Sequence, residues 1–509
     1  MGDKASTARP QKEEARMRRR NTLLMALAVS GLTACTTPEA PAPAQPGTFT
    51  MAVTEPAALL PGQALDQPGK LLVGALWTPL MTVDNPGAAP VPAAAEKVES
   101  PDQRRWTIRL RPGWRFHDNT PVTARSYAQT WAMARQQRWA AAGLLDQLQV
   151  QEVATPDDLT VEVTLAAAQR HFPVALTSTL LAPLSEQALT RRDWKTLIGN
   201  GPYRAEGQWS QGIRLTANPA YAGATKAKSE AIKVVVATAE AQYAQLTAGG
   251  IDLATEIPAA EHGKLTSQFA NRSTTWPQPE ATYLAFPARP EYADPARRHA
   301  LSMAVDREAL ATGPLSHRVT PATALLPAAL GADRKDSACR PCVHDVQAAA
   351  LLARQSELPK NLTVYFNQDT DQRTWIEPLA AQLRLSLNAE AITTKGLPAA
   401  EYTDRLDHHR FDGPYLLTAH ATYPHPTALL SRLATQVGFT HPSFAELLAG
   451  ADTSEAADRD LRLAENIALR ELPLAPLWSP HGHLYWSTRL ADVTPDPVTG
   501  LRLAGIRAG

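Results

Sequence analysis

In residues 104–137, hydrophobic and polar residues first alternate one by one and then follow the spacing of a helix with an apolar side. Trp106, Ile108 and Leu110 alternate with polar residues, which is the pattern of a half-buried strand. The turn-forming sequence HDNTP follows, and Thr123 stands where it can cap a helix with an apolar side. This stretch therefore predicts a strand, a turn and a helix.

The rest of the chain shows the same succession of patterns. We expect strands at 48–53 and 362–368, a glycine-punctuated hairpin at 198–223, a strand–helix–strand unit at 231–258, and helices at 293–310 and about 374–387. In the helix at 293–310, Asp294 is the expected N-cap and Pro295 the first helical residue. Strands that alternate with helices indicate α/β lobes.

The N-terminus differs in composition from the rest of the chain. Its first 34 residues carry seven Lys or Arg and three Asp or Glu, and the basic cluster runs into a short apolar stretch. A charged region, an apolar stretch and small residues form an export signal that is too short to span a bilayer. We therefore predict a signal peptide over residues 1–34.

The sequence LTAC, which ends at Cys35, is similar to a bacterial lipobox, where the chain is cut before the cysteine and a lipid is attached to it. The alternative is a buried helix with a chance cysteine. The proline-rich segment 35–47 keeps the chain extended, as a membrane tether requires. We expect an exported protein that a lipid on Cys35 anchors to the outer face of the cell membrane. The export route, general or twin-arginine, stays open.

Composition narrows the classes of function. The chain has 509 residues, 44% of them hydrophobic, and this length indicates two to four lobes. Its 50 Lys and Arg balance 50 Asp and Glu, so no basic field attracts nucleic acid.

The sequence has no G-x-S-x-G, H-E-x-x-H or G-x-G-x-x-G motif, and segment 62–71 departs from a P-loop in its spacing. We predict neither an enzyme nor a cofactor site.

Cys339 and Cys342 form the sequence CRPC. In an exported protein this spacing predicts a small disulfide that fixes a loop. A redox pair would open a helix in a thioredoxin-like unit, and the surrounding sequence lacks that pattern. Two thiols alone do not make a zinc site.

Five segments of the chain resemble, in the same order, the family 5 extracellular solute-binding proteins. They read WTIRLRPGWRFHDNTPVTARS, IGNGPYR, AGGIDLATEIP, TYLAFPARPEYADPARRHALSMAVDREAL and LAENIALRELPLAPLW. This family contains the oligopeptide-, dipeptide- and nickel-binding receptors of ATP-binding-cassette (ABC) importers. The chain departs from the family pattern at Asn119, Asn200, Gly250 and Pro287.

The resemblance implies an α/β fold of the periplasmic-binding-protein type (type II, three-domain cluster C), with two lobes that close on a ligand and a discontinuous first lobe. By analogy, lobe I comprises residues 48–80, 195–285 and 475–509, lobe II residues 81–194, and lobe III residues 286–474. The hinge is expected near residues 285 and 475.

The resemblance also implies a function and partners. The expected ligand is a peptide or peptide-like solute held in the interlobe cleft, and the expected partners are an ABC permease and its ATPase. The protein is expected to act as a monomer. Two alternatives stay open: a receptor for a metal chelate or other non-peptide solute, and a tethered scaffold that has lost transport.

A late loop resembles a family cleft loop written W-x-A-D-Y-x-D-P. Aligned on Tyr423 and Pro426, it has Ala419 for the Trp, Thr422 for the first Asp and His425 for the second. In the family's peptide receptors the first Asp pairs with the terminal ammonium of the ligand. A buried ammonium requires a paired charge, which a threonine hydroxyl does not provide. The usual anchor is therefore missing, and another acid or another kind of ligand must replace it.

We expect eight residues to contact the ligand, because aromatic and loop side chains give varied ligands a contact surface. They are Trp77, Tyr283, Phe286, Ala419, His420, Thr422, Tyr423 and His425. Several histidines are candidate ligands for nickel or copper, which imidazole suits. They are His408, His409, His420, His425, His481 and His483. Their local spacing fixes no third ligand, so we predict no metal site.

Overall fold

The computed structural model describes residues 46–509 apart from 86–87, 193–194, 208, 210–211, 331–338, 452 and 454–455. The predicted signal peptide at 1–34, the lipidation site at Cys35 and nearly all of the tether at 35–47 lie outside the described residues. In the part of the chain that the structure describes, no helix is both long and apolar enough to cross a membrane.

Twelve strands form one large sheet. They are β1 (Thr48–Val53), β8 (Tyr203–Glu206), β9 (Ile213–Ala217), β10 (Ala231–Val236), β11 (Leu253–Ala254), β12 (Ser273–Pro277), β13 (Glu280–Ala285), β14 (Val319–Pro321), β15 (Asn361–Asn367), β16 (Ala391–Leu397), β17 (Tyr415–His420) and β18 (Leu474–Trp486). Their order is β16, β15, β17, β13, β18, β11, β1, β10, β9 and β8, with β12 and β14 also paired to β18.

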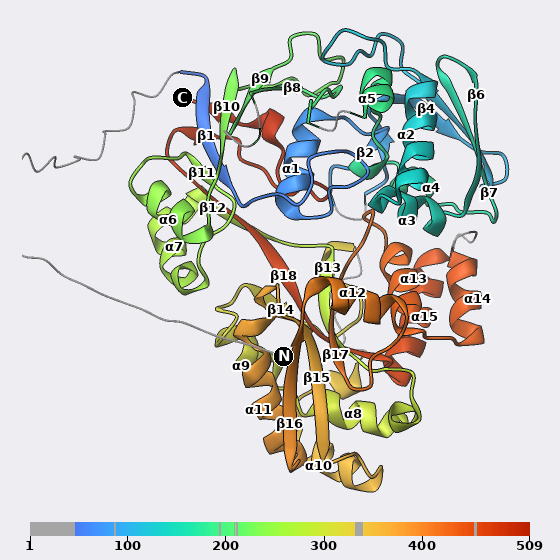
Figure 1. Cartoon of the computed structure of the whole chain (residues 1–509), viewed down its shortest axis with the longest axis vertical. Coiled ribbons are helices and arrows are strands. Elements are labelled where there is room, and N and C mark those ends of the chain that lie inside the picture. Colours follow the sequence, from blue (N-terminus) through green and yellow to red (C-terminus); the bar gives the residue numbers. More distant parts are fainter. Residues whose placement is uncertain are drawn as a thin grey trace, which may run out of the picture. The chain divides into compact units, whose positions relative to one another are not determined.

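The long strand β18 joins two halves of this sheet (Figure 1). Near its start it pairs with β13, and near its end it pairs with β11 and β12. The half that contains β1 and β10 and the half that contains β15 and β17 therefore share one strand, although their sequences lie far apart.

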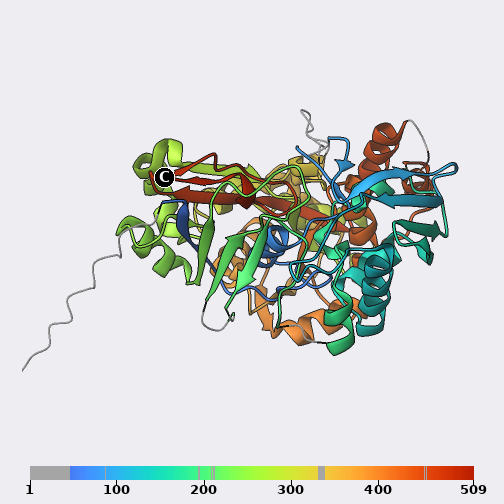
Figure 2. The ribbon, with the colours of Figure 1, turned by 90° about the horizontal axis from the view of Figure 1, so that it is seen from above.

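A separate four-stranded antiparallel sheet has the order β4, β5, β7 and β6. Its strands are β4 (Ala95–Glu99), β5 (Arg105–Leu110), β6 (Val150–Asp157) and β7 (Thr160–Leu165). The helices α2 (Ala124–Gln137) and α3 (Ala140–Gln147) lie with it on one side of the molecule in both views (Figures 1 and 2).

The remaining helices and short strand pairs complete the described chain. The helices are α1 (Gln67–Leu76), α4 (Phe172–Ala175), α5 (Glu186–Arg191), α6 (Ala239–Thr247), α7 (His262–Phe269), α8 (Pro295–Met303), α9 (Arg307–Thr312), α10 (Val346–Gln355), α11 (Ile376–Leu387), α12 (Ala399–Asp407), α13 (Pro426–Val437), α14 (Pro442–Ala451) and α15 (Ala457–Glu471). The short pairs are β2 (Met81–Thr82) with β3 (Val91–Pro92), and β19 (Leu490–Ala491) with β20 (Arg507–Ala508).

Most predicted elements are confirmed. The side chains of Trp106, Ile108 and Leu110 are buried along β5, and α2 begins after Thr123, whose amide donates to the Ser126 hydroxyl at 3.2 Å. The hairpin is β8 with β9, and the unit at 231–258 is β10, α6 and β11. Asn119 has a φ of 69° in the turn before α2, a conformation that Asn tolerates better than most residues.

The single helix predicted at 293–310 is wrong, because the structure has two helices there, α8 and α9. The first helix ends at Met303, and Asp306 caps the second, since its carboxylate accepts from the Ala309 amide at 2.9 Å. The guanidinium of the next residue, Arg307, is buried and donates to the carbonyls of Pro476 and Cys342. Contacts with distant segments therefore fix the break.

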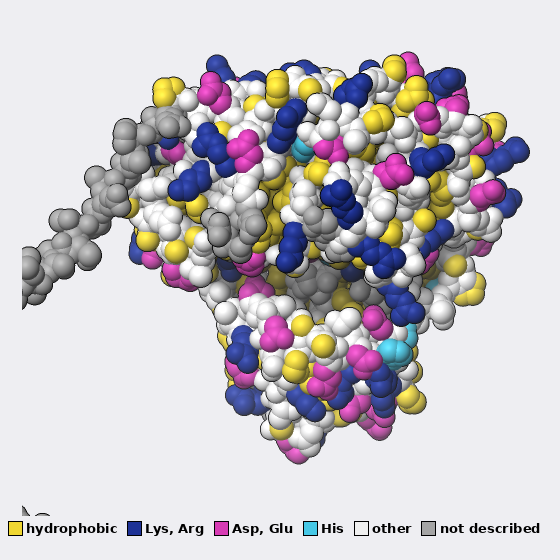
Figure 3. Space-filling model, turned by 45° about the horizontal axis from the view of Figure 1, so that its top comes forward, with side chains coloured by type: hydrophobic (Ala, Val, Ile, Leu, Met, Phe, Trp, Pro, Cys, Tyr) yellow, Lys and Arg dark blue, Asp and Glu magenta, His cyan; other side chains and the backbone are white. Residues whose placement is uncertain are grey.

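Charged side chains are mixed on the molecular surface. Figure 3 shows Lys and Arg interspersed with Asp and Glu over one face. Cys339 and Cys342 are joined by a disulfide beside α8 and α9.

Candidate functional site

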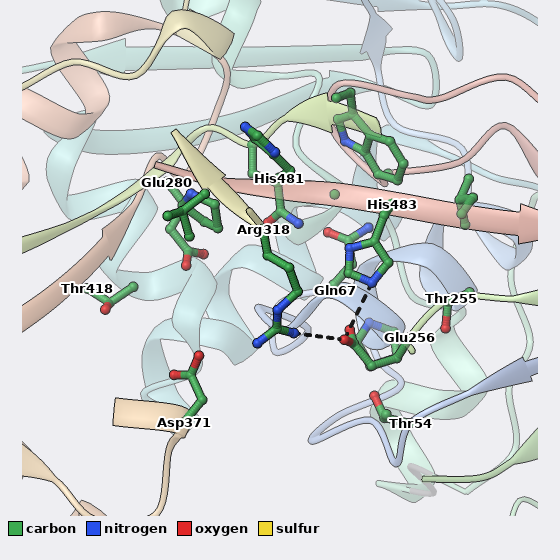
Figure 4. Close-up of a pocket in the computed structure, with 18 of the residues that line it drawn as sticks. Thr54, Gln67, Thr255, Glu256, Glu280, Arg318, Asp371, Thr418, His481 and His483 are labelled. Atoms are coloured by element: carbon green, nitrogen blue, oxygen red, sulfur yellow. Dashed lines mark hydrogen bonds and ion pairs between the residues drawn. The ribbon is translucent and has the colours of Figure 1, made fainter. Parts of the chain in front are cut away.

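A cavity of about 260 Å³ lies where the two halves of the large sheet meet at β18. Segments far apart in the sequence line it, including Gln67 at the start of α1, Glu256 after β11, Arg318 before β14 and Asp371 after β15 (Figure 4). Its volume is just below the roughly 300–1,000 Å³ that is typical of small-molecule sites. Such a cavity suits a small polar ligand.

One carboxylate in this cavity lies close to an arginine and a histidine. The Oε1 atom of Glu256 lies 3.5 Å from Nη1 of Arg318 and 3.5 Å from Nε2 of His483 (Figure 4). Burial favours a raised pKa for Glu256, but the hydrogen bond and charge of His483, together with Arg318, hold the pKa below its ordinary value. This trio links residues of β18 and the β11 region to the segment before β14.

Two further carboxylates face the same space. Figure 4 shows Asp371 and Glu280 pointing into the cavity on one side of the Arg318 guanidinium. Burial raises the pKa of Asp371, although the charge of Arg318 opposes this effect. Burial also raises the pKa of Glu280, where the charge of Lys70 lowers it and that of Asp371 raises it further. Both shifts reflect carboxylates whose negative charge is poorly compensated.

Tryptophan side chains provide the apolar part of the cavity wall. Trp276, Trp375 and Trp478 all line the cavity, and the rings of Trp375 and Trp478 meet edge to face with centroids 4.6 Å apart. Aromatic walls with a few polar groups are typical of small-molecule sites, and aromatic faces attract cations.

The two histidines that line the cavity, His481 and His483, contact side chains beside it. His483 packs edge to face on His262 with ring centroids 4.5 Å apart, and Nε2 of His481 lies 2.6 Å from the Thr320 hydroxyl. Burial lowers the pKa of His262 to about 4 and also lowers the pKa of His481. Across the described ranges, no group of three or more His, Cys, Asp or Glu has a geometry that could hold a metal ion.

The loop after β17 packs against residues from the β4–β7 region. The Thr422 hydroxyl donates to Oε1 of Gln147 at 2.9 Å, at the end of α3. The ring of His171 stacks on His425 at 4.7 Å and on Tyr423 at 5.6 Å between centroids. Burial, followed by the charge of His171, lowers the pKa of His425 to about 3. The loop side chains therefore hold two segments together.

The other residues predicted to contact ligand lie in or near the hydrophobic cores. Trp77, Tyr283, Phe286 and Ala419 are all buried, and the Tyr283 hydroxyl donates to the Leu325 carbonyl at 2.6 Å. His420, Thr422 and Tyr423 line a second, smaller cavity of about 30 Å³. Among the described residues, the lining of the larger cavity includes none of the eight predicted residues. Their contact with ligand stays a prediction.

Sequence reasoning missed the charged residues of the larger cavity: Glu256, Glu280, Arg318 and Asp371. One signal was present for Asp371, which follows the carboxyl end of the predicted strand at 362–368. Ligands of open α/β sheets bind beyond the carboxyl ends of strands. The other three residues carry no local pattern that marks a ligand site.

Known proteins resemble this chain over most of its length. The family model of the bacterial extracellular solute-binding proteins, family 5, middle region, matches residues 89–440. The periplasmic murein peptide-binding protein MppA of Escherichia coli K12 is 25% identical over 465 residues, which cover 83% of this chain and 86% of MppA. The probable deoxycholate-binding periplasmic protein YgiS of the same organism is 25% identical over 471 residues, 84% of this chain and 86% of YgiS.

The similarity extends to three-dimensional structure. The solved structure of the Escherichia coli murein tripeptide binding protein MppA matches with a TM-score of 0.76 and 20% sequence identity, over 91% of this chain and 98% of that chain. The expected α/β fold of the periplasmic-binding-protein type is therefore confirmed.

Proposed function

The chain belongs to family 5 of the bacterial extracellular solute-binding proteins, and from this premise we propose that it captures peptides or peptide-like solutes for an ABC importer. The observation that carries the proposal is the cavity of about 260 Å³ at β18, which combines charged groups with tryptophan walls. Peptides offer both charged ends and apolar side chains, which such a lining can bind.

The names of the relatives favour a peptide ligand. MppA is named for murein peptide binding, and the alignment covers 86% of its length. YgiS is named as a probable deoxycholate-binding protein, so a non-peptide solute is the second candidate. Deoxycholate is an anion, and the three carboxylates that line the cavity oppose an anionic ligand. The electrostatics of this chain therefore favour the peptide.

The proposed mechanism is lobe closure around the ligand. We take residues 48–80, 195–285 and 475–509 as lobe I, 81–194 as lobe II and 286–474 as lobe III, with the hinge near 285 and 475. A ligand that contacts more than one lobe binds the closed state of the protein more tightly than the open state. This difference in affinity shifts the population of protein molecules toward the closed state. A permease that recognises the closed state then receives the ligand, and its partner ATPase supplies the energy.

The N-terminal sequence supports a place for the protein outside the cytoplasm. The signal at 1–34 and the cysteine at the end of LTAC favour export and a lipid on Cys35, with the segment 35–47 as the tether. The lipid would keep the receptor beside its permease.

Mass spectrometry of the solutes released from natively purified protein tests the proposed function. We expect a mixture of short peptides or peptide-like compounds. A matched pair of variants provides the control. Thr418→Trp fills the cavity and should release no peptide, whereas Thr247→Trp at an exposed position of α6 should release as much as the wild type. Release of bile acids, metal chelates or no solute from the wild type would refute the proposal.

A further inference from the structure

The wall of the larger cavity carries more acidic than basic groups. Its lining contains Glu256, Glu280 and Asp371, and among the described lining residues Arg318 is the one Lys or Arg. The pKa of His481 is lowered by burial and then by the charge of His483, which keeps its imidazole neutral near pH 7. An empty cavity of this kind has a surplus of negative charge.

The surplus of negative charge in the larger cavity lies on two of its three carboxylates. Glu256 has Arg318 and His483 as partners. The carboxylates of Asp371 and Glu280 make no hydrogen bond or ion pair with another residue in the described ranges, and both point into the cavity (Figure 4). A carboxylate that is removed from bulk water without a partner is unfavourable, so a cation in this space would be stabilised.

Asp371 is the less compensated of the two acids. The charges of Lys70, which lines the smaller cavity, and of Arg432 both lower the pKa of Glu280. For Asp371, the opposing cation is Arg318, which is already paired with Glu256. A ligand cation therefore gains more from Asp371 than from Glu280.

The loop at 419–425 is not available for this task in the structure. The hydroxyl of Thr422 donates a hydrogen bond to Oε1 of Gln147, and Tyr423 and His425 are stacked with His171. None of these three residues lines the larger cavity. A cation in the larger cavity must therefore be bound by residues outside this loop.

We propose that Asp371, assisted by Glu280, binds the cationic group of the ligand, an ammonium or guanidinium, between the tryptophan walls of the larger cavity. The inference rests on the proposed function, because it specifies how the same cavity selects its ligand. Trp375 directly borders the segment of Asp371 and lines the cavity with Trp478, so a cation held by Asp371 lies close to aromatic faces that attract it. A ligand with a blocked amine and no other cation loses both interactions.

Calorimetric titration of the full chain, purified in detergent and freed of bound solutes, tests the inference with three probes. The probes are trialanine, trialanine amide and N-acetyltrialanine. We expect the first two to bind at least tenfold more tightly than the acetylated peptide. Asp371→Asn should lose this preference and bind both amines at least tenfold more weakly, with an unchanged affinity for the acetylated peptide. Glu280→Gln should have a smaller effect in the same direction.

Two further variants separate charge from folding. Asp371→Glu keeps the negative charge and should restore most of the affinity for trialanine, whereas Asp407→Asn removes an exposed carboxylate at the end of α12 and should change nothing. Equal binding of free and acetylated peptides, or wild-type affinity in Asp371→Asn, would overturn the inference and leave the proposed function intact. Failure of the wild type to bind any of the three probes would overturn both.

Discussion

At the scale of single residues, the burial of titratable side chains without an opposite charge connects stability with ligand binding. The carboxylate of Asp371 faces the cavity and has no hydrogen bond or ion pair with another residue in the described part of the chain. The ring of His425 is held neutral in a stack with other rings. The identity of Thr422 in the sequence showed that the family's usual acid is absent. The position of Asp371 relative to Arg318 and Trp478 depends on the fold, and sequence reasoning had no means to find it.

The pH dependence of stability should depend on His425. Its pKa of about 3 in the folded chain lies below the ordinary value of 6.5, so the unfolded chain binds a proton that the folded chain does not. Stability is therefore lost as the pH falls from about 6.5 toward 3. We predict that His425→Asn shows a shallower fall in Tm between pH 7.5 and 5.5, because Asn keeps the N-cap of α13. Equal slopes for variant and wild type would contradict this prediction.

The empty protein should become more stable when Asp371 loses its charge. The raised pKa of Asp371 means that the folded chain holds its proton to a higher pH than the unfolded chain, whose carboxyl titrates near 3.8. Stability from this group is therefore lost as the pH rises from below 3.8 toward the raised pKa of the folded chain. We predict a higher Tm for ligand-free Asp371→Asn at pH 7 and a smaller difference as the pH is lowered below 3.8.

This gain in stability would accompany a loss of binding, as is common for residues that serve a site rather than the fold. The exposed control Asp407→Asn should leave Tm unchanged at both ends of this pH range. A lower Tm for Asp371→Asn at pH 7 would show that its carboxylate supports the fold.

At the scale of elements, the sequence predicted that a helix forms more reliably than it predicted where the helix ends. The alternation in β5 and the cap of α2 were readable because they depend on neighbours in sequence. The break between α8 and α9 was not readable, because Arg307 reaches carbonyls of Cys342 and Pro476. Local patterns predict elements, and distant contacts decide where some of them stop.

Arg298 should be a main support of the C-terminus of α15. From α8 its buried guanidinium donates to the carbonyls of Glu471 at 2.9 Å and Leu472 at 3.1 Å, and also to that of Ala293. Arg298→Ala leaves these acceptors without a donor, so we predict a loss of about 3 kcal/mol in the free energy of unfolding. Urea denaturation provides the measurement.

The exposed Arg354 of α10 is a matched control for this substitution. Arg354→Ala should change the free energy of unfolding by less than about 0.5 kcal/mol, as is usual at the surface. Similar values for the two variants would show that the α15 carbonyls do not depend on Arg298.

At the scale of the whole molecule, the order of five motifs was sufficient to predict the fold type. Each motif is short, but together they span most of the chain, as does the family match at residues 89–440. The sequence did not reveal that one strand, β18, would belong to both halves of the large sheet. That pairing brings Glu256, Arg318 and Asp371 to a common cavity.

The shared strand predicts cooperative unfolding of the two halves. β18 pairs with β11 and β12 on one side of the cavity and with β13 and β14 on the other, so neither half can lose this strand alone. We expect calorimetry to show one transition for both halves of the large sheet. Two transitions, with proteolytic fragments that divide the large sheet at β18, would contradict this expectation.

A crystal structure of the protein purified with its natural ligand tests the central claim most directly. The account predicts density for a peptide or peptide-like solute in the cavity at β18, with a cationic group beside Asp371 and contact with Trp478. Ligand density at another place, or a bound solute whose anionic group faces Asp371, would contradict it.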